Sequence, residues 1–167
     1  MKLLLIGAMG AGKSTIGQIL AYKLGCPYFD NDTEISVKYG NTREKLATLS
    51  VKELHDLETQ YLIDVLKRTG SFISGAAASV IDRESNRNLI SETVGVYLRL
   101  PLDKIIERAG THGIGRQGLT ESGTQILVDR FKARDPLYKS TAKLTINLSD
   151  SAEKDAEKIV AFLSSLE

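Results

Sequence analysis

The sequence predicts an α/β protein in three layers, with a parallel β-sheet between two layers of helices. Short apolar runs alternate along the chain with segments of helical periodicity, which is typical of consecutive βα units. The apolar runs show little alternation with polar residues, as expected for strands that are buried on both faces of a parallel sheet. In such folds, ligands bind beyond the carboxyl ends of the strands.

Each element follows from these two patterns. Strands are expected where short apolar runs are bounded by glycine, proline or polar residues, at 1–6, 27–29, 71–74, 94–100 and 143–148. Helices are expected where apolar side chains recur every three or four residues, at 14–24, 33–39, 41–48, 51–68, 81–91, 102–109, 122–134 and 152–163. Gly25 and Gly70 follow two of these helices, where glycine commonly ends a helix. The segment 110–118 holds four glycines, and we expect a mobile lid there.

Length and charge limit the possible functions. The 167 residues are enough for one well-buried domain and few for two, so we expect a single domain over 1–167. A net charge of +1 gives no overall field that would favour nucleic acid or a membrane surface. Cys26 is the only cysteine, so we expect it to be a small buried side chain rather than half of a disulfide. No apolar run reaches the length of a signal peptide core or a membrane span, so we expect a cytoplasmic protein. We also expect a monomer.

The segment 7–15 has the pattern of a phosphate-binding loop, G-x-x-x-x-G-K-[ST], with a strand before it and a helix after it. Glycines allow backbone N–H groups to converge on an anion, and the start of the next helix adds unpaired donors and the positive end of its dipole. Lysine supplies a charge for the outer phosphates, and a serine hydroxyl suits a magnesium ion. The pattern therefore predicts a nucleoside triphosphate held by Gly10, Ala11, Gly12, Lys13, Ser14 and Thr15.

Two further groups follow strands at the same edge of the sheet. Asp30 and Asp32 come after the second strand, where one carboxylate can support magnesium and the other can accept a proton from an attacking hydroxyl. An aspartate just before Thr33 would also be a helix N-cap, so for Asp32 alone both interpretations stay open. The small residues 75–78 follow the third strand, and they either let the backbone approach a ligand or form only a tight turn.

Several charged residues are candidates whose pattern alone does not decide their role. Arg116 lies in the glycine-rich segment, where an arginine on a closing lid would neutralise charge on a transferring phosphoryl group; the alternative is a solvated surface arginine. Arg134 is expected at the end of a helix, where a cation also stabilises the helix dipole. His55 and Glu58 lie one turn apart on the long helix, and their pattern alone favours a polar helix face.

The motifs favour a kinase over the other classes of phosphate-loop protein. A GTPase would have Asn-Lys-x-Asp after a late strand, but 147–150 reads Asn-Leu-Ser-Asp. A motor-type ATPase would have an acidic pair at the end of an apolar strand, but the third and fourth strands end in Ser-Gly and Arg-Leu. A small chain with Asp-x-Asp after a strand and a basic glycine-rich segment suits a small-molecule kinase.

The order of the motifs resembles the shikimate kinases over nearly the whole chain. The segments 7–15, 29–32 and 134–138 are similar to the family's phosphate loop, its Asp-x-Asp and its Arg-x-Pro-Leu-Tyr segment. Arg116 falls at the family's lid arginine, and Glu58 falls at the glutamate of its Phe-Arg-x-x-Glu motif. The resemblance implies a P-loop kinase fold with a five-stranded parallel sheet in the order 2-3-1-4-5 and a mobile lid at about 110–120.

The resemblance also implies ATP- and magnesium-dependent phosphoryl transfer to a hydroxyl of a small molecule, with shikimate as the first candidate. It gives catalytic roles to Lys13, Asp32 and Arg116. Asp32 would orient the acceptor hydroxyl, and Ser14 and Asp30 would hold magnesium. The implied nucleotide-binding set adds Arg108, near the adenine, and Arg116 to residues 10–15. The implied acceptor-binding residues are Asp32, His55, Glu58, Gly75, Ala76, Ala77 and Arg134.

Departures from the family pattern fall on the acceptor side. His55 stands where the family has an arginine, and Gly75-Ala76-Ala77 stands where it has three glycines. A histidine lacks the permanently charged fork of arginine, and losing such a contact to a buried carboxylate costs about 2–5 kcal/mol. Three functions therefore stay open at this point: a weak or permissive shikimate kinase, a kinase of another small hydroxyl compound, and a nucleotide-binding module that has lost acceptor phosphorylation.

Overall fold

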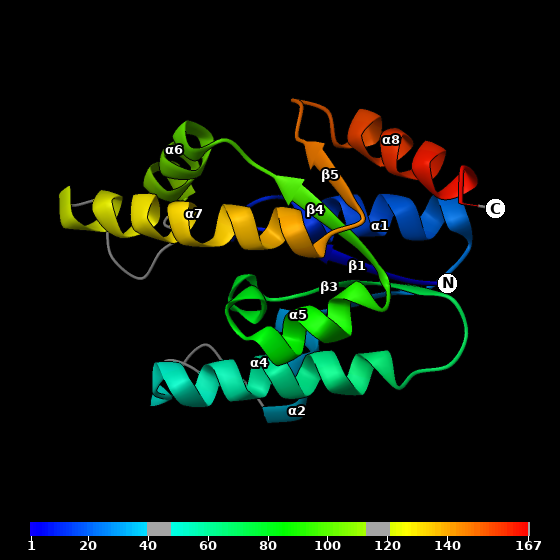
Figure 1. The fold of residues 1–167 in the computed structure, drawn as a ribbon, viewed down its shortest axis with the longest axis horizontal. Coiled ribbons are helices and arrows are strands. Elements are labelled where there is room, and N and C mark those ends of the chain that lie inside the picture. Colours follow the sequence, from blue (N-terminus) through cyan, green and yellow to red (C-terminus); the bar gives the residue numbers. More distant parts are fainter. Residues whose placement is uncertain (40–47, 113–120, 167) are drawn as a thin grey trace.

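A five-stranded parallel sheet in the order β2-β3-β1-β4-β5 forms the middle layer of the structure (Figure 1). The structure is a computed structural model, and it describes residues 1–39, 48–112 and 121–166. The strands are β1 Lys2–Ile6, β2 Tyr28–Asp30, β3 Phe72–Gly75, β4 Val94–Arg99 and β5 Leu144–Asn147. All four neighbouring pairs are parallel, so both the fold class and the strand order expected from the sequence are confirmed.

Helices cover both faces of this sheet. They are α1 Lys13–Leu24, α2 Asn31–Tyr39, α4 Val51–Leu66, α5 Glu84–Ser91, α6 Leu102–His112, α7 Glu121–Thr141 and α8 Ala152–Ser164, with a 3₁₀ helix η1 at Ala78–Asp82. Side chains of α1 and α8 pack on one face of the sheet, and side chains of α4, α5 and α7 pack on the other. The result is the three-layer arrangement that parallel strands require, because neither face of the sheet is left to water.

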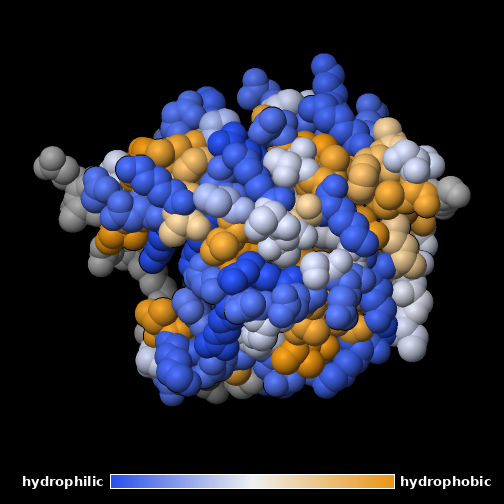
Figure 2. All heavy atoms as spheres, viewed as in Figure 1, coloured by the Kyte–Doolittle hydropathy of each residue, from blue (hydrophilic) through white to orange (hydrophobic). Residues whose placement is uncertain are grey.

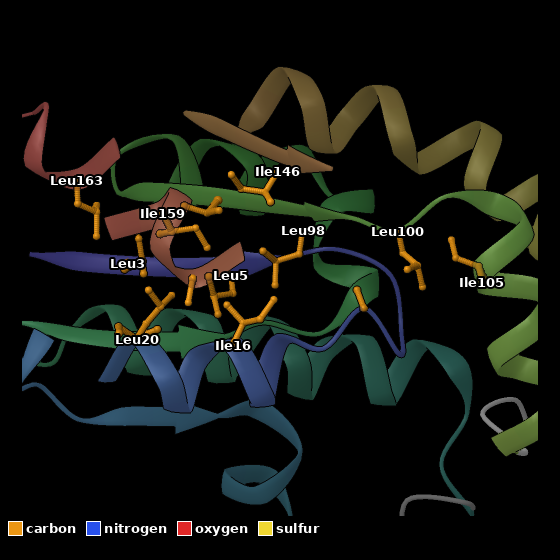
Figure 3. Packing of buried hydrophobic residues seen from close by; sticks show 14 residues of the cluster. Leu3, Leu5, Ile16, Leu20, Leu98, Leu100, Ile105, Ile146, Ile159 and Leu163 are labelled. Atoms are coloured by element: carbon orange, nitrogen blue, oxygen red, sulfur yellow. The ribbon is translucent and has the colours of Figure 1, made fainter. Parts of the chain in front are cut away.

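The central strand β1 contributes to both cores because its side chains point alternately to the two faces. Leu3 and Leu5 pack with α1 and α8, as Figure 3 shows, whereas Leu4 and Ile6 pack with α4, α5 and α7. All four side chains are completely buried. Burying each one contributes about 1.5–3 kcal/mol, so the strand that leads into the phosphate loop is held firmly from both sides.

Local sequence signals set several helix boundaries. Ser50 and Glu53 form a capping box at the start of α4: the Ser50 Oγ accepts from the Glu53 N–H at 3.2 Å, and the Glu53 carboxylate accepts from the Ser50 N–H at 2.8 Å. Gly25 ends α1 in the left-handed conformation, with φ of 62°, and donates its N–H to the Ala21 carbonyl. The capping box therefore sets the start of α4 at Val51, and Gly25 sets the end of α1 at Leu24.

Five expected boundaries were wrong or incomplete. Helix α4 ends at Leu66 with Lys67 as its C-cap, so Gly70 does not end it. Helix α2 begins at Asn31, and α7 continues through Pro136 to Thr141 instead of ending before it. The helix expected at 81–91 is two helices, η1 and α5, because Arg83 between them is extended, with φ of −92° and ψ of 127°. Helix α6 runs to His112, past the expected start of the lid. The rest of that lid, and the helix expected at 41–48 up to residue 47, lie outside the described residues.

Polar and apolar residues are interspersed over the face of the molecule that Figure 2 shows. In the described part of the chain, none of the helices combines the length and the apolar character that crossing a bilayer demands.

Candidate active site

The phosphate loop connects β1 to α1 through backbone conformations that favour glycine. Gly7, Gly10 and Gly12 all have positive φ, of 146°, 77° and 81°. A Cβ atom at Gly7 would also lie only 2.6 Å from the Leu98 carbonyl oxygen of β4, so a larger residue cannot fit there. Gly12 precedes α1 without a side-chain cap, and the first N–H groups of that helix are therefore available to an anion.

The ammonium group of Lys13 lies against this loop. Its Nζ donates hydrogen bonds to the carbonyl oxygens of Gly7 and Ala8, both at 2.9 Å. Burial lowers the Lys13 pKa to about 8, and the negative charges of Asp32 and Asp30 oppose that shift. The lysine is thus a poorly hydrated cation beside the phosphate loop, and a polyphosphate bound there would stabilise its charge.

A network of three residues joins α1 to the end of β2. The Ser14 hydroxyl donates to Asp30 Oδ2 at 2.7 Å, and the Tyr28 hydroxyl donates to the same oxygen at 3.1 Å. Burial raises the Asp30 pKa, but the hydrogen bonds to this carboxylate outweigh burial and leave its pKa below the ordinary value. A hydroxyl beside an ionised carboxylate fits Mg²⁺, which takes one or two protein oxygens together with phosphate oxygens and water.

The structure separates the roles of the two aspartates at the end of β2. Asp30 Oδ1 accepts from the N–H groups of Asp32 and Thr33, both at 3.1 Å, so the cap of α2 is Asp30 and not Asp32. The Asp32 carboxylate instead accepts from the Asn31 amide at 3.1 Å. Asn31 is only 4% exposed, so it fixes one oxygen of Asp32 from the protein side while Asp32 itself is exposed.

Most of the candidate residues line one open cleft of about 300 Å³ at the carboxyl ends of β1, β2 and β3. Its lining consists of Met9, Gly10, Gly12, Lys13, Ser14, Thr15, Asp30, Asn31, Asp32, Glu58, Gly75, Ala76, Ala77 and Ala78. Phosphate-binding and acceptor-side candidates therefore share one space, as expected for strands that end at one edge of a sheet. Ala11, Arg108 and Arg134 lie outside this lining. Ala11 is buried in the core and donates its N–H to the Ala8 carbonyl at 3.2 Å, and Arg108 and Arg134 line a neighbouring cavity of about 90 Å³.

Glu58 marks the acceptor end of this cleft. Burial raises the Glu58 pKa, while a hydrogen bond from the Ser79 hydroxyl and the charges of His55 and Arg134 lower it and the charge of Asp32 raises it. These interactions place His55, Asp32 and Arg134 within electrostatic reach of one carboxyl group. His55 lies one turn before Glu58 on α4 and is not among the residues that line the cleft.

Arg134 is held by a bidentate ion pair with Asp82, the last residue of η1. Arg134 Nε and Nη2 donate to the two oxygens of Asp82 at 2.9 and 2.6 Å. Burial lowers the Arg134 pKa, but the paired carboxylate more than offsets this and the pKa lies above its ordinary value. Because α7 continues for seven residues beyond Arg134, this arginine is not in the last turn, and the helix-dipole interpretation fails.

Close approach explains the glycine at the end of β3. A Cβ atom at Gly75 would lie 2.5 Å from the Tyr28 hydroxyl that bonds to Asp30 and 3.6 Å from Lys13 Cβ. Gly75 is therefore required by the packing of the site and not only by a turn. Ala76 is buried in the second core, so its methyl group packs inward although the residue lines the cleft.

Arg108 reaches the phosphate loop from α6. Its Nη1 donates to the Gly10 carbonyl at 2.6 Å, and its side chain lines the neighbouring cavity of about 90 Å³ rather than the cleft. Arg116 lies outside the described residues, so its role stays a prediction from the sequence.

Four site residues were missed by sequence reasoning: Tyr28, Asn31, Ser79 and Asp82. Asn31 had a usable signal, because it lies between the two aspartates, and Ser79 directly follows the small residues 75–78. The pairing of Asp82 with Arg134 left no signal in the sequence, because 52 residues separate the two partners.

Comparison with known proteins agrees with this geometry. A family model described as shikimate kinase matches residues 9–164, which is nearly the whole chain. The chain belongs to the shikimate kinase family. It is accordingly an ATP-dependent kinase of a small molecule.

Individual shikimate kinases are similar over most of their length. The shikimate kinase of Rhizobium leguminosarum is 34% identical over 154 residues, which cover 92% of this chain and 78% of the relative. Shikimate kinase 1 of Yersinia pestis is 32% identical over 166 residues, which cover 96% of this chain and 95% of the relative. Among solved structures, the shikimate kinase of Acinetobacter baumannii in complex with shikimate superposes with a TM-score of 0.86 at 30% identity, covering 99% of this chain and 94% of that one.

Proposed function

We propose that this shikimate kinase family member transfers the γ-phosphoryl group of ATP to a hydroxyl group of shikimate, with Mg²⁺. The observation that supports this most directly is the shared cleft, in which Lys13 and Ser14 of the phosphate loop face the same space as Asp32 and Glu58. A binding module would need only the first pair, whereas a kinase needs the donor phosphates and the acceptor alcohol side by side.

The donor side would act through position and charge. Backbone N–H groups of residues 10–15 and the Lys13 ammonium would hold the phosphates of ATP. Ser14 and Asp30 would hold Mg²⁺, which when bound neutralises charge on the phosphate oxygens. Arg108, already in contact with Gly10, would lie beside the nucleotide. The predicted role of Arg116 is to add positive charge over the transferring group.

The acceptor side would use Asp32 as the group that orients the attacking hydroxyl. The hydroxyl oxygen forms a bond to the γ-phosphorus, the bond from that phosphorus to the bridging oxygen breaks, and ADP leaves with the electron pair. The hydroxyl proton goes to the Asp32 carboxylate, whose other contact, from Asn31, keeps it in place. Burial of Asn31 makes this position rigid.

Arg134 would bind the carboxylate of shikimate. Its guanidinium is within electrostatic reach of Glu58 at the acceptor end of the cleft. The sequence analysis also assigned Arg134 to the acceptor. His55 replaces a second arginine there, so we expect shikimate to bind more weakly than it would with two charged forks, by about 2–5 kcal/mol if the lost contact were fully buried.

Steady-state kinetics would test this function. ADP release is measured with ATP, Mg²⁺ and a panel of hydroxylated acids, sugars and nucleosides, with an active shikimate kinase beside it. We expect shikimate to give the highest kcat/KM, and Asp32→Asn to abolish turnover while ATP still binds. Asp64→Asn, at an exposed position on α4, is the matched control and should behave as the unchanged protein. No ADP above background with shikimate would reject the proposal, and a higher kcat/KM for another acceptor would redirect it.

A further inference from the structure

The guanidinium group of Arg134 is only half used by its ion pair. Asp82 accepts from Nε and from Nη2, which form one side edge of the guanidinium plane. A guanidinium has five N–H donors, so three remain, on Nη1 and on the outer side of Nη2. Within the described part of the chain, no residue accepts a hydrogen bond from Nη1. Its end edge, formed by Nη1 and Nη2, is a second fork that matches a carboxylate.

Both partners of this ion pair come from well-anchored elements. On the Asp82 side, Val80 and Ile81 of η1 are buried in the core between η1, α4 and α5. The next residue, Arg83, donates to Asp56 of α4 at 2.6 Å. On the Arg134 side, Tyr138 lies one turn further along α7 and donates to the Ala78 carbonyl at 2.7 Å. The pair therefore joins two fixed elements rather than two mobile side chains.

We propose that Asp82 is a positioning residue for the acceptor, which clamps one edge of Arg134 so that the other edge receives the carboxylate of the substrate. This inference rests on the proposed function, because it takes the acceptor to be a carboxylic acid. Asp82 touches neither reacting atom and acts only through Arg134.

The arrangement has particular weight in this chain because residue 55, where the resemblance to the family implies an arginine, is a histidine. Arg134 then bears more of the recognition of a carboxylate, and a long arginine side chain that is free to rotate loses entropy on binding. The negative charge of Asp82 also opposes an incoming carboxylate. However, the Asp82 side chain is 39% exposed, so water screens that repulsion, whereas the Arg134 side chain that it orients is only 18% exposed.

Kinetics with two acceptors would test the clamp. For Asp82→Ala, we expect the KM for shikimate to rise by about two- to fivefold, which is the range expected for a partly exposed ion pair. The kcat and the KM for ATP should stay within about twofold of the unchanged protein. The methyl ester of shikimate lacks the carboxylate charge, so its KM should not change. Asp82→Glu keeps a carboxylate and should recover part of the shikimate affinity.

A matched control removes an ion pair of the same kind elsewhere in the fold. Glu34→Ala breaks the partly exposed Arg68–Glu34 pair, at 2.8 Å, and leaves both η1 and the Arg134–Asp82 pair in place. We expect it to leave the KM for shikimate unchanged. If Asp82→Ala does not fold, Asp82→Asn serves instead, because it removes the charge and one acceptor while it keeps the shape.

Three results would overturn the clamp. They are an unchanged or lower KM for shikimate in the Asp82 variants, an equal rise for the methyl ester, and an equal rise in Glu34→Ala. Calorimetric titration of shikimate separates this inference from the proposed function. If the unchanged protein does not phosphorylate shikimate, the proposed function fails, but weaker shikimate binding in the Asp82 variants would still support the clamp. Equal binding in all variants, or binding in none, would overturn it.

Discussion

Replacing Lys13 by methionine should make the folded protein more stable and remove its affinity for ATP. The Lys13 ammonium is held in the phosphate loop by the carbonyl groups of Gly7 and Ala8, at 2.9 Å each. Burial lowers its pKa from 10.5 to about 8, even though two aspartates oppose the shift. The free protein therefore keeps this charge at a cost in folding free energy, which a bound polyphosphate would offset.

The size of the effect follows from that pKa. A shift from 10.5 to about 8 corresponds to roughly 3 kcal/mol at the usual 1.36 kcal/mol per unit. Methionine fills similar space without a charge. The two carbonyl groups lose their donor, which costs about 1–3 kcal/mol where they stay buried and less where water reaches them. We expect a net stabilisation of about 1–2 kcal/mol at neutral pH.

The difference in unfolding free energy between the Lys13→Met variant and the unchanged protein should decrease as the pH rises. Between about pH 8 and pH 10.5, unfolded chains bind more protons at Lys13 than folded ones, so the stability of the unchanged protein rises with pH in this window. The methionine variant lacks this contribution. The difference in unfolding free energy between the two proteins should therefore shrink as the pH rises through this range, because other titrating groups are common to both.

Urea denaturation of both proteins at several pH values between neutral and alkaline would measure this difference, with equal m-values as a check on two-state behaviour. Lys23→Met is the matched control, since Lys23 lies on the same helix with only a distant partner, Glu157 at 3.9 Å, and should change stability by no more than about 0.5 kcal/mol. A methionine variant that is less stable at neutral pH, or a difference that does not shrink with pH, would refute the reasoning. Retained ATP affinity would refute the role of the loop.

Three further substitutions test separate parts of the site. Ser14→Ala removes the proposed Mg²⁺ ligand and a donor to Asp30, so the Mg²⁺ concentration for half-maximal turnover should rise by about tenfold. An unchanged Mg²⁺ dependence would contradict the proposed role. His55→Arg adds a charged fork near Glu58. If its contact with the shikimate carboxylate contributes about 1 kcal/mol or more, the KM for shikimate should fall by fivefold or more. A higher KM would show that residue 55 does not face the carboxylate. Gly75→Ala places a Cβ 2.5 Å from the Tyr28 hydroxyl. The unfolding free energy should therefore fall by about 1–3 kcal/mol, and turnover should fall with it. A melting temperature equal to that of the unchanged protein would show that the site adapts.

Local signals predicted the sheet and the donor side of the site. The strands are short apolar runs, and their burial on both faces makes that pattern hard to mistake, as with Leu3, Leu4 and Leu5. The phosphate loop is likewise contained in one stretch of the chain, and its glycines have the positive φ angles that the pattern implies. Both predictions depend on residues that are neighbours in sequence, which is why they could be made without the structure.

The end of α7 could not be predicted in this way. A proline in a helix removes a hydrogen bond and usually marks a boundary, yet α7 continues through Pro136. Distant partners hold the following turn: Tyr138 stacks on Tyr97 with ring centroids 4.7 Å apart, and Asp135 accepts hydrogen bonds from Tyr97 and Arg99, both at 2.8 Å. These contacts outweigh the local preference, and a window of neighbouring residues does not contain them.

On the acceptor side, too, contacts between residues distant in sequence could not be predicted. Sequence reasoning assigned Arg134 and Glu58, but the residues that hold them, Asp82 and Ser79, come from η1, which follows β3. The extended Arg83 that ends η1 is fixed by Asp56 on another helix, so even the helix break depends on a tertiary contact.

In the proposed function, a phosphoryl group moves from ATP to shikimate in the cleft between the phosphate loop and Asp32. Phosphorus NMR of the protein incubated with ATP, Mg²⁺ and shikimate follows donor and product in one sample. We predict that a phosphomonoester signal grows at the same rate as ADP and is absent with Asp32→Asn. ADP formed with inorganic phosphate alone, or ATP left unchanged, would contradict the account.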